Sequence, residues 1–265
     1  MTTLLAFDTA TERMSVALNH RGRIVARSGD GGAKASATLL PAIFEVLAEA
    51  GIALADVDAI AFGRGPGAFT GLRTACSVAQ GLAFGAGKTV LPIDSLLAVA
   101  EDARVEAGLH GRVWAVIDAR MGQVYAAEYK HVEGRWSTRV APCLSTCDAL
   151  VERWRDDPPQ AVAGNAIAMV GARLATGTAA LAPAATSNAL ALLRLAERGW
   201  AEGDAVDPAL ALPVYVRDHV ADTIVEREAL RASRSAIGRG DDPLPDSVPS
   251  LREGGAGAVG APLKT

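Results

Sequence analysis

The hydrophobic positions of the first hundred residues alternate between two periodicities. Short apolar runs predict strands, and the first three form a meander that turns at Arg21 and Gly22. Apolar residues then recur at helical spacing, and Pro41 is tolerated because it falls in the first turn. The predicted order is strands at 4–8, 14–19 and 24–27, a helix at 36–50, a strand at 57–62, a helix at 70–84, a strand at 89–93 and a helix at 95–107. Such alternation favours an α/β fold with a partly parallel sheet.

The second half of the chain begins with the same pattern. Residues 113–140 again contain an apolar strand that ends in an aspartate, a short loop, and two strands around a glycine turn. Asp118 corresponds to Asp8, and Gly134 corresponds to Gly22. We interpret this as an internal duplication, with chance similarity between two hairpins as the alternative. The remaining predicted elements are helices at 145–154, 166–175 and 187–203 and a strand at 161–163.

These patterns divide the chain into an N-terminal lobe at residues 1–108, a C-terminal lobe at 109–220 and a tail at 221–265. The periodic signal fades after Arg217, and from Gly238 the chain is rich in glycine, proline and polar residues. Because such a composition buries little apolar surface, we expect the tail to be mostly disordered.

Composition and charge exclude several classes of function. Half of the 265 residues are hydrophobic, so the chain has enough apolar side chains for a sizeable core. The net charge of −4 provides no basic field for a polyanion, so we expect contact with RNA only through a partner. The first residues lack the features of a signal peptide, and no apolar stretch reaches the roughly 20 residues that a membrane span needs. We therefore expect a cytoplasmic protein that does not bind membranes.

Potential metal ligands are sparse. The three cysteines, Cys76, Cys143 and Cys147, are too few and too irregularly spaced for a disulfide framework or a zinc site, so we expect buried or free thiols. The four histidines stand alone, without a pair three or four residues apart. The sequence predicts no metal site.

Candidate nucleotide-binding residues lie at the ends of the first strands of the two halves. Loops that face each other across a cleft would place Asp8 and Asp118 where a phosphate-bound metal ion needs oxygen ligands. The hydroxyl groups of Thr9 and Thr11 are candidate donors in the first loop. The second loop, "ARMG" at 119–122, is less suited, because bulky side chains stand where close backbone N–H groups are needed. Turn or capping roles are the alternative for both aspartates.

The stretch "GRGPGAFTGLR", residues 63–73, lies between a predicted strand and a predicted helix. That context suits an anion at a helix N-terminus. The spacing does not match the dinucleotide fingerprint, because Thr70 stands where the third glycine is needed. A tight turn, with Pro66 as turn former and Thr70 as N-cap, is the alternative. "GAGKT" at 85–89 resembles the end of a P-loop, but it follows a helix and enters a strand, so we exclude it.

Four segments together resemble the TsaB (YeaZ) family, a bacterial subunit of the machinery that makes tRNA threonylcarbamoyladenosine. They are "LLAFDTATERMSVAL" at 4–18, "GRGPGAFTGLRTACSVAQGLAFG" at 63–85, "LPIDSLLAVA" at 91–100 and "AVIDARMGQVYAAEY" at 115–129. In addition, "PVYVRD" at 213–218 is similar to the family's closing strand. The resemblance implies an α/β, duplicated actin-like (ASKHA) fold with two βββαβαβα-type lobes, the second partly degenerate.

The resemblance also implies a function without catalysis by this chain. Family members are non-catalytic scaffold subunits that bind and activate TsaD, together with the ATPase TsaE, for threonylcarbamoylation at N6 of adenosine 37 in tRNAs that read ANN codons. TsaD holds its metal through histidines just after a strand, and the similar segment here, 93–102, contains none. We expect no catalytic residue and no resident cofactor. The complex would use ATP and Mg²⁺ and would contact tRNA, and a homodimer is a possible state of the chain alone.

In the family, the first two helices of the N-terminal lobe pair with TsaD. Small residues at four-residue spacing in the second of these helices would let a partner helix approach closely, and they are Ala75, Ala79 and Ala83. A bulky charge at one of them is expected to abolish partner binding while leaving the fold intact. Core packing is the alternative for this face. The other candidate partner contacts are Arg64, Phe69 and Arg73.

Two other functions compete with the scaffold interpretation. A small-molecule kinase or ATP-binding protein of the same fold is motivated by Asp8, Thr11 and the glycine-rich stretch. Against it, "VAGNA" at 162–166 has only Gly164 where the adenine side of such sites has two glycines. A glycoprotease would need a metal or nucleophile constellation that the sequence lacks, so we rank it last.

Overall fold

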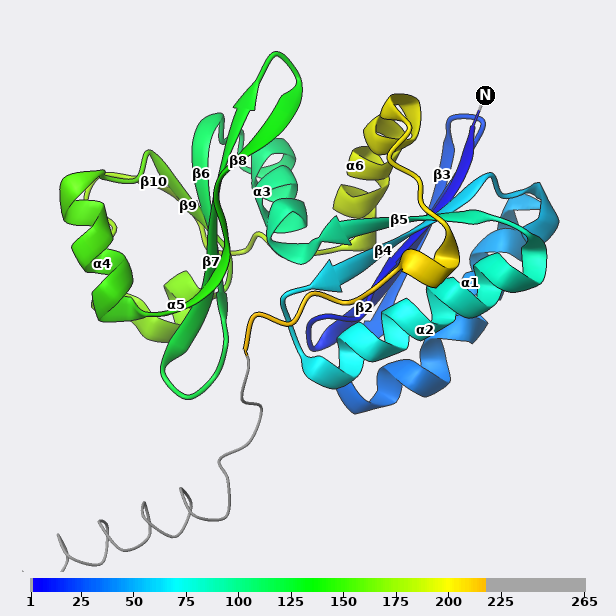
Figure 1. The fold of residues 1–265 in the computed structure, drawn as a ribbon, viewed down its shortest axis with the longest axis horizontal. Helices are drawn as coiled ribbons and strands as arrows, with labels where there is room; N and C mark the ends of the chain where they lie inside the picture. The colour runs from blue at the N-terminus through cyan, green and yellow to red at the C-terminus, as the bar shows by residue number, and fades with distance from the viewer. Residues whose placement is uncertain (1, 218–265) are drawn as a thin grey trace, which may run out of the picture. The chain divides into compact units, whose positions relative to one another are not determined.

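Two sheets of the same topology form the frame of residues 2–217, the part of the chain that this computed structural model describes (Figure 1). In the first sheet the three N-terminal strands are antiparallel, and the last two run parallel to the first strand of the chain. The second sheet repeats these directions. The strand order in the first sheet is β3 (Arg23–Asp30), β2 (Arg13–His20), β1 (Thr3–Asp8), β4 (Ala59–Gly65) and β5 (Thr89–Asp94). The order in the second is β10 (Ala180–Ala182), β9 (Ala161–Ala163), β6 (Gly111–Asp118), β7 (Gln123–Val132) and β8 (Arg135–Thr146).

Helices follow the strands in the same order in both halves, so each half has the sequence βββαβαβα. The α-helices are α1 (Ala35–Ala50), α2 (Phe69–Ala86), α3 (Ser95–Glu106), α4 (Cys147–Asp156), α5 (Ala166–Val170) and α6 (Ala189–Glu202). Short 3₁₀ turns are η1 (Gly32–Lys34), η2 (Leu54–Asp56), η3 (Gly171–Arg173) and η4 (Pro208–Leu210). The short β9, β10 and α5 make the second half the more degenerate one. The predicted duplication and the predicted fold class are confirmed.

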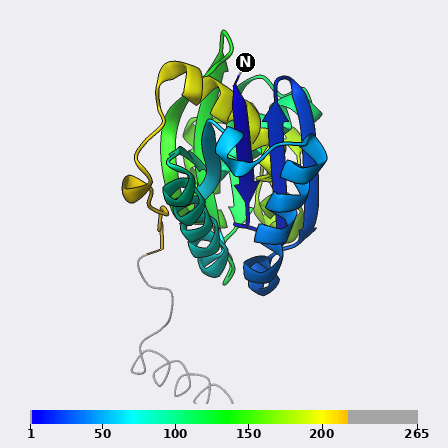
Figure 2. The same cartoon turned by 90° about the vertical axis from the view of Figure 1, so that its right-hand side faces the viewer.

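Helices α1 and α2 lie side by side on one face of the first sheet (Figures 1 and 2). Both carry apolar side chains that spacing places on one stripe, and these pack on the inward positions of the strands. The core of this layer includes Leu5, Phe7, Val16, Leu39, Ile43, Leu47, Phe62, Ala75 and Ala79. Burial of this many apolar side chains is what holds the two helices on the sheet.

The last helix of each half packs on the sheet of the other half. The opposite face of the first sheet is covered by α6, whose Leu192 and Ala196 pack with Leu4 and Ala6 of β1. Helix α3 packs on the second sheet, in a core cluster that also contains Tyr129 of β7, and its Ala98 also packs in the cluster of Leu4 and Leu192. The two halves of the chain are therefore interlocked. The boundary at residue 108 stays a prediction.

Three local expectations differ from the structure. Thr70 does not cap α2, because the N-cap is Ala68 in an extended conformation without a side-chain capping bond. The helix expected at 166–175 ends at Val170, where Gly171 takes a positive φ of 55°, and β10 was not predicted. Residues 213–217 form no strand: Pro213 has no N–H for a ladder, and Val214 donates a single bond to the carbonyl of Arg64, 2.7 Å. Residue 218 and the predicted tail at 221–265 lie outside the described residues.

Candidate functional site

The glycines of residues 63–73 make room for the chain's own backbone. A Cβ on Gly71 would lie 1.9 Å from the carbonyl oxygen of Thr9, and one on Gly67 would lie 2.7 Å from that of Ala10. A Cβ on Gly63 would lie 2.2 Å from a carboxylate oxygen of Asp8. The β1–β2 loop therefore fills the space from which a phosphate would approach these glycines. This packing favours the tight-turn interpretation of the stretch over the phosphate cradle.

Asp8 and Thr9 are buried in that contact. The carboxylate of Asp8 accepts hydrogen bonds from the N–H of Ala10 and the hydroxyl of Ser187, which comes from the loop before α6. Burial raises the pKa of Asp8, although both hydrogen bonds oppose the rise by stabilising the charged form. The hydroxyl of Thr9 donates to the carbonyl of Gly71, 2.7 Å. Both polar groups are thus engaged inside the fold.

Thr11 and Asp118 instead line a cleft of about 530 Å³ between the β1–β2 and β6–β7 loops. The carboxylate of Asp118 accepts from the N–H of Arg120, 3.0 Å, and the backbone N–H of Asp118 donates to Asn165, 2.9 Å. Arg120 forms an ion pair with Glu12 from the opposite loop. Thr11 and Asp118 are thus the two of the four predicted nucleotide-binding residues that the structure brings together. The ion pair of Arg120 and Glu12 links the two loops beside this cleft.

Oxygen and nitrogen donors in this cleft are too dispersed to form a metal centre. Among residues 2–217, no group of three or more His, Cys, Asp or Glu side chains lies close enough to hold a metal ion. Of the four predicted residues, Thr11 and Asp118 line the cleft. Their hydroxyl and carboxylate groups have the chemistry to contact a bound nucleotide. Thr11 donates to the carbonyl of Arg13, 2.9 Å.

The predicted partner-contact residues are engaged within the chain. Arg64 pairs with Asp94, 2.6 Å. The side chains of Ala75, Ala79 and Ala83 are fully buried in the core of the first sheet. The expectation that these three alanines face a partner is corrected accordingly, because the chain's own core already covers them. A bulky charge there would disrupt the fold as well.

Phe69 and Arg73, at the start of α2, contact a segment that follows α6. The ring centroids of Phe69 and Tyr215 are 5.2 Å apart, and the Nε of Arg73 donates to the hydroxyl of Tyr215, 3.1 Å. The guanidinium of Arg73 also lies over the ring of Phe69, 3.8 Å from its centroid. Sequence reasoning did not find Tyr215 as a functional candidate, although it lies in the segment that resembles the family's closing strand.

Residues 204–217, which we call the strap, run from the end of α6 along β5 and α2 toward the β6–β7 loop (Figure 1). Val206 pairs with Val90 of β5. The side-chain amide of Gln80 donates to the carbonyls of Pro208 and Ala211, 3.1 and 3.0 Å. The strap thereby contacts β5 and α2, which lie more than a hundred residues before it in the sequence.

Three large apolar side chains are exposed on the two adjacent helices. Leu40 and Phe44 of α1 are 39% and 53% exposed, and Phe84 of α2 is 60% exposed. We call these three residues the docking face. The sequence carries the signal for it, because Leu40 and Phe44 are one helical turn apart on a stripe beside the buried Leu39 and Ile43. These side chains offer apolar surface that a partner could bury.

The duplicated βββαβαβα architecture, with a cleft between two equivalent hairpin loops, defines the actin-like (ASKHA) class of proteins. A family model described as "TsaD: tRNA N6-adenosine threonylcarbamoyltransferase" matches residues 32–221. The TsaB protein of Haemophilus influenzae, named for tRNA threonylcarbamoyladenosine biosynthesis, is 35% identical over 82% of this chain and 94% of its own length. The chain belongs to the TsaB (YeaZ) family.

Further relatives agree with this assignment. The Escherichia coli TsaB protein is also 35% identical, over 82% of this chain and 96% of its own. The solved structure of YeaZ from Pseudomonas aeruginosa is 39% identical, with a TM-score of 0.71, and covers 81% of this chain and 100% of its own. Among the helices of the described residues, none is long and apolar enough to cross a membrane.

Proposed function

We propose that this chain is a non-catalytic subunit that binds and activates TsaD, together with TsaE, in the N6-threonylcarbamoylation of adenosine 37 of tRNAs that read ANN codons. ATP and Mg²⁺ are used by the complex, and tRNA is contacted through it. A homodimer through the same surface is the state of the chain without its partner. The proposed location is the cytoplasm, where tRNA is modified.

The docking face is the observation that carries this proposal. Leu40, Phe44 and Phe84 are exposed on neighbouring helices, and a partner that covers them would gain the free energy of burying their apolar surface. A TsaD-type partner has the same class of fold, since the TsaD family model matches most of this chain. Two such proteins can offer each other equivalent helix pairs, and helices of this kind pack by fitting ridges into grooves.

Two features of the site support the non-catalytic role. The carboxylate of Asp8 is buried and bonded to Ser187 and Ala10, so it does not face the cleft. The glycines that would surround a phosphate are packed against the β1–β2 loop. Both features replace ligand contacts by contacts within the chain.

The proposal is tested by mixing this chain with TsaD from the same organism. Phe84→Asp is expected to weaken co-elution with TsaD at least tenfold and to lower the yield of modified tRNA, because it places a charge in the apolar contact. Val132→Asp is the matched control, since Val132 is 47% exposed on β7, away from α1 and α2. Absence of binding by the unaltered chain, or equal binding by both variants, would contradict the proposal.

A second function, ATP binding by this chain itself, is favoured by the cleft that Thr11 and Asp118 line. Its test is calorimetric titration of the isolated chain with Mg·ATP, with Asp118→Asn as the variant. Tight binding that the substitution weakens would support it. An absence of heat at millimolar nucleotide would leave the cleft as a remnant of the duplicated fold.

A further inference from the structure

The last three described residues of the strap each contact a different part of the molecule. Tyr215 packs on Phe69 and accepts from Arg73 at the start of α2. Val216 packs against the core of the second sheet. Arg217 reaches the β6–β7 loop, at the rim of the cleft.

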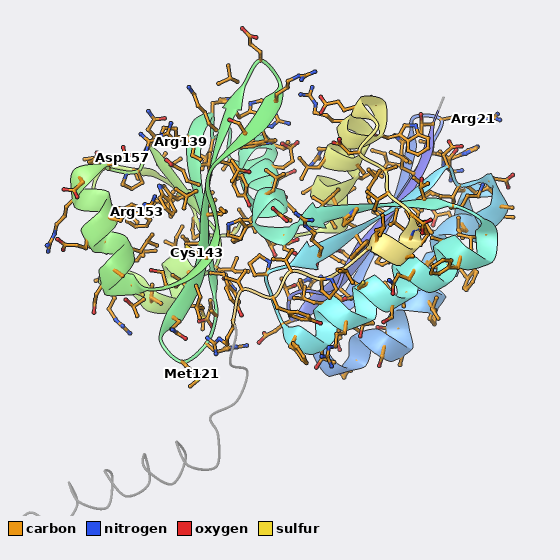
Figure 3. The ribbon with its side chains drawn as sticks, viewed as in Figure 1. Arg21, Met121, Arg139, Cys143, Arg153 and Asp157 are labelled. Carbon is orange, nitrogen blue, oxygen red and sulfur yellow. The ribbon has the colours of Figure 1, made fainter. Side chains whose placement is uncertain are left out.

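Arg217 clamps both ends of that loop. Its Nη2 donates to the carbonyl of Ala119, 2.8 Å, and to the side-chain oxygen of Gln123, 2.9 Å. The loop is closed by the N–H of Ala119 on the carbonyl of Gln123, 3.0 Å, with Met121 exposed at its tip (Figure 3). Hydrogen bonds from a charged donor are among the stronger ones in proteins. The loop thus depends on the strap for part of its conformation.

Only a short stretch of backbone separates the contacts of Tyr215 from those of Arg217. The Cα atoms of Tyr215 and Arg217 are two residues apart, a span of at most about 7 Å in extended chain. On the α2 side, Val214 donates to the carbonyl of Arg64, 2.7 Å, and the Cys76 thiol donates to the carbonyl of Ala211, 3.3 Å. A displacement of the β6–β7 loop that moves Arg217 must therefore be absorbed at Tyr215.

We propose that the strap links the cleft rim to α2, with Tyr215 and Arg217 as positioning residues for the docking face. Residues 119–123 and the first turns of α2 then share one set of contacts, although they lie in different halves of the chain. Because such a linkage is reciprocal, loosening either end loosens the other. The role of α2 in docking rests on the proposed function, whereas the linkage itself is a property of the isolated chain.

Hydrogen exchange on the full-length protein tests the linkage. Arg217→Ala is expected to speed exchange at the amides of residues 72–76 at least about threefold, although Arg217 bonds only to the β6–β7 loop among the described contacts. Tyr215→Leu is expected to speed exchange at residues 119–123. Arg173→Ala is the control, because the Arg173 side chain is exposed near the same loop and makes no hydrogen bond to the side chains or backbone of residues 2–217. Faster exchange confined to residues 119–123 in Arg217→Ala would overturn the linkage.

A second readout separates this inference from the proposed function. If TsaD binds the unaltered chain, Arg217→Ala is expected to weaken that binding several-fold, and Arg217→Lys, which keeps the charge, to restore part of it. Unchanged affinity in Arg217→Ala, together with lost affinity in Phe84→Asp, would overturn the positioning role and leave the docking face standing. Failure of the unaltered chain to bind TsaD would refute the proposed function, while the exchange data still decide the linkage.

Discussion

Asp8 and Asp118 occupy equivalent positions in the two halves, but their surroundings differ. Asp118 borders the cleft, whereas Asp8 is covered by the glycine-rich turn and bonded to Ser187, which is 179 residues away in the sequence. A pattern of strands and turns reveals the equivalence of the two positions. It does not reveal the burial of one of them, because the covering residue comes from the far end of the chain. The Asp8 carboxylate is thus a structural group in a position that the sequence favours for ligand binding.

Burial of Asp8 predicts a particular pH dependence of stability. Its pKa lies above the ordinary value of 3.8 in the folded chain, so the folded state retains the proton better than the unfolded state does. The stability that comes from protonated Asp8 is therefore full below pH 3.8 and is lost as pH rises toward the raised pKa. Asp8→Asn keeps an acceptor for Ala10 and removes the charge.

We expect the free energy of unfolding of Asp8→Asn, minus that of the unaltered chain, to increase as the pH rises from 4 to 7, because only the unaltered chain loses the stability that comes from protonated Asp8. Urea denaturation at several pH values measures this difference, in which the contributions of all other groups cancel. Asp118→Asn, at the equivalent position beside the cleft, is the control. A difference that stays constant with pH would contradict the raised pKa.

At the scale of the element, α2 carries two stripes whose roles the sequence does not separate. Ala75, Ala79 and Ala83 are small enough for either a partner helix or the chain's own core, and the structure places them in the core. The exposed stripe is formed by other residues, among them Ser77 and Phe84. Periodicity predicted the helix within a few residues, but small side chains give no hydrophobic contrast between its faces.

The two stripes of α2 respond differently to a charge. Ala79→Glu is expected to lower the free energy of unfolding by more than about 4 kcal/mol, because it buries an unpaired carboxylate in the core. Ser77→Glu, on the exposed stripe, is expected to change it by less than about 0.5 kcal/mol. Thermal or denaturant unfolding followed by circular dichroism compares the two. Equal stability would mean that α2 presents the alanines to solvent.

The elements that were missed or misjudged from the sequence are short or lack a clear hydrophobic period. The three-residue β10 is too short for its period to be detected, and α5 ends where Gly171 departs from helical geometry. A strand was expected at 213–218 only because "PVYVRD" resembles the family's closing strand, and Pro213 has no N–H for a strand ladder. Both glycine turns and all of the longer strands were predicted, since apolar runs or alternation over six to twelve residues are strong signals.

For the whole molecule, the exchange of α3 and α6 makes each sheet depend on the other half of the chain. A fragment of residues 1–108 lacks α6, so the face of β1 that contains Leu4 and Ala6 would be open to water. We expect this fragment to bind the dye ANS and to give a poorly dispersed NMR spectrum, unlike residues 1–217. Cooperative unfolding of the fragment alone would show that the first lobe is independent.

The packing of α6 on the first sheet also affects how the chain folds while it is being synthesised. The ribosome releases β1, α1 and α2 long before residues 189–202, which supply the second cover of the first sheet. Most of one apolar face of that sheet therefore remains exposed until about three-quarters of the chain has been made. Nascent chains of this protein have to pass through that interval without aggregating, which makes them natural clients for chaperones that shield apolar surface.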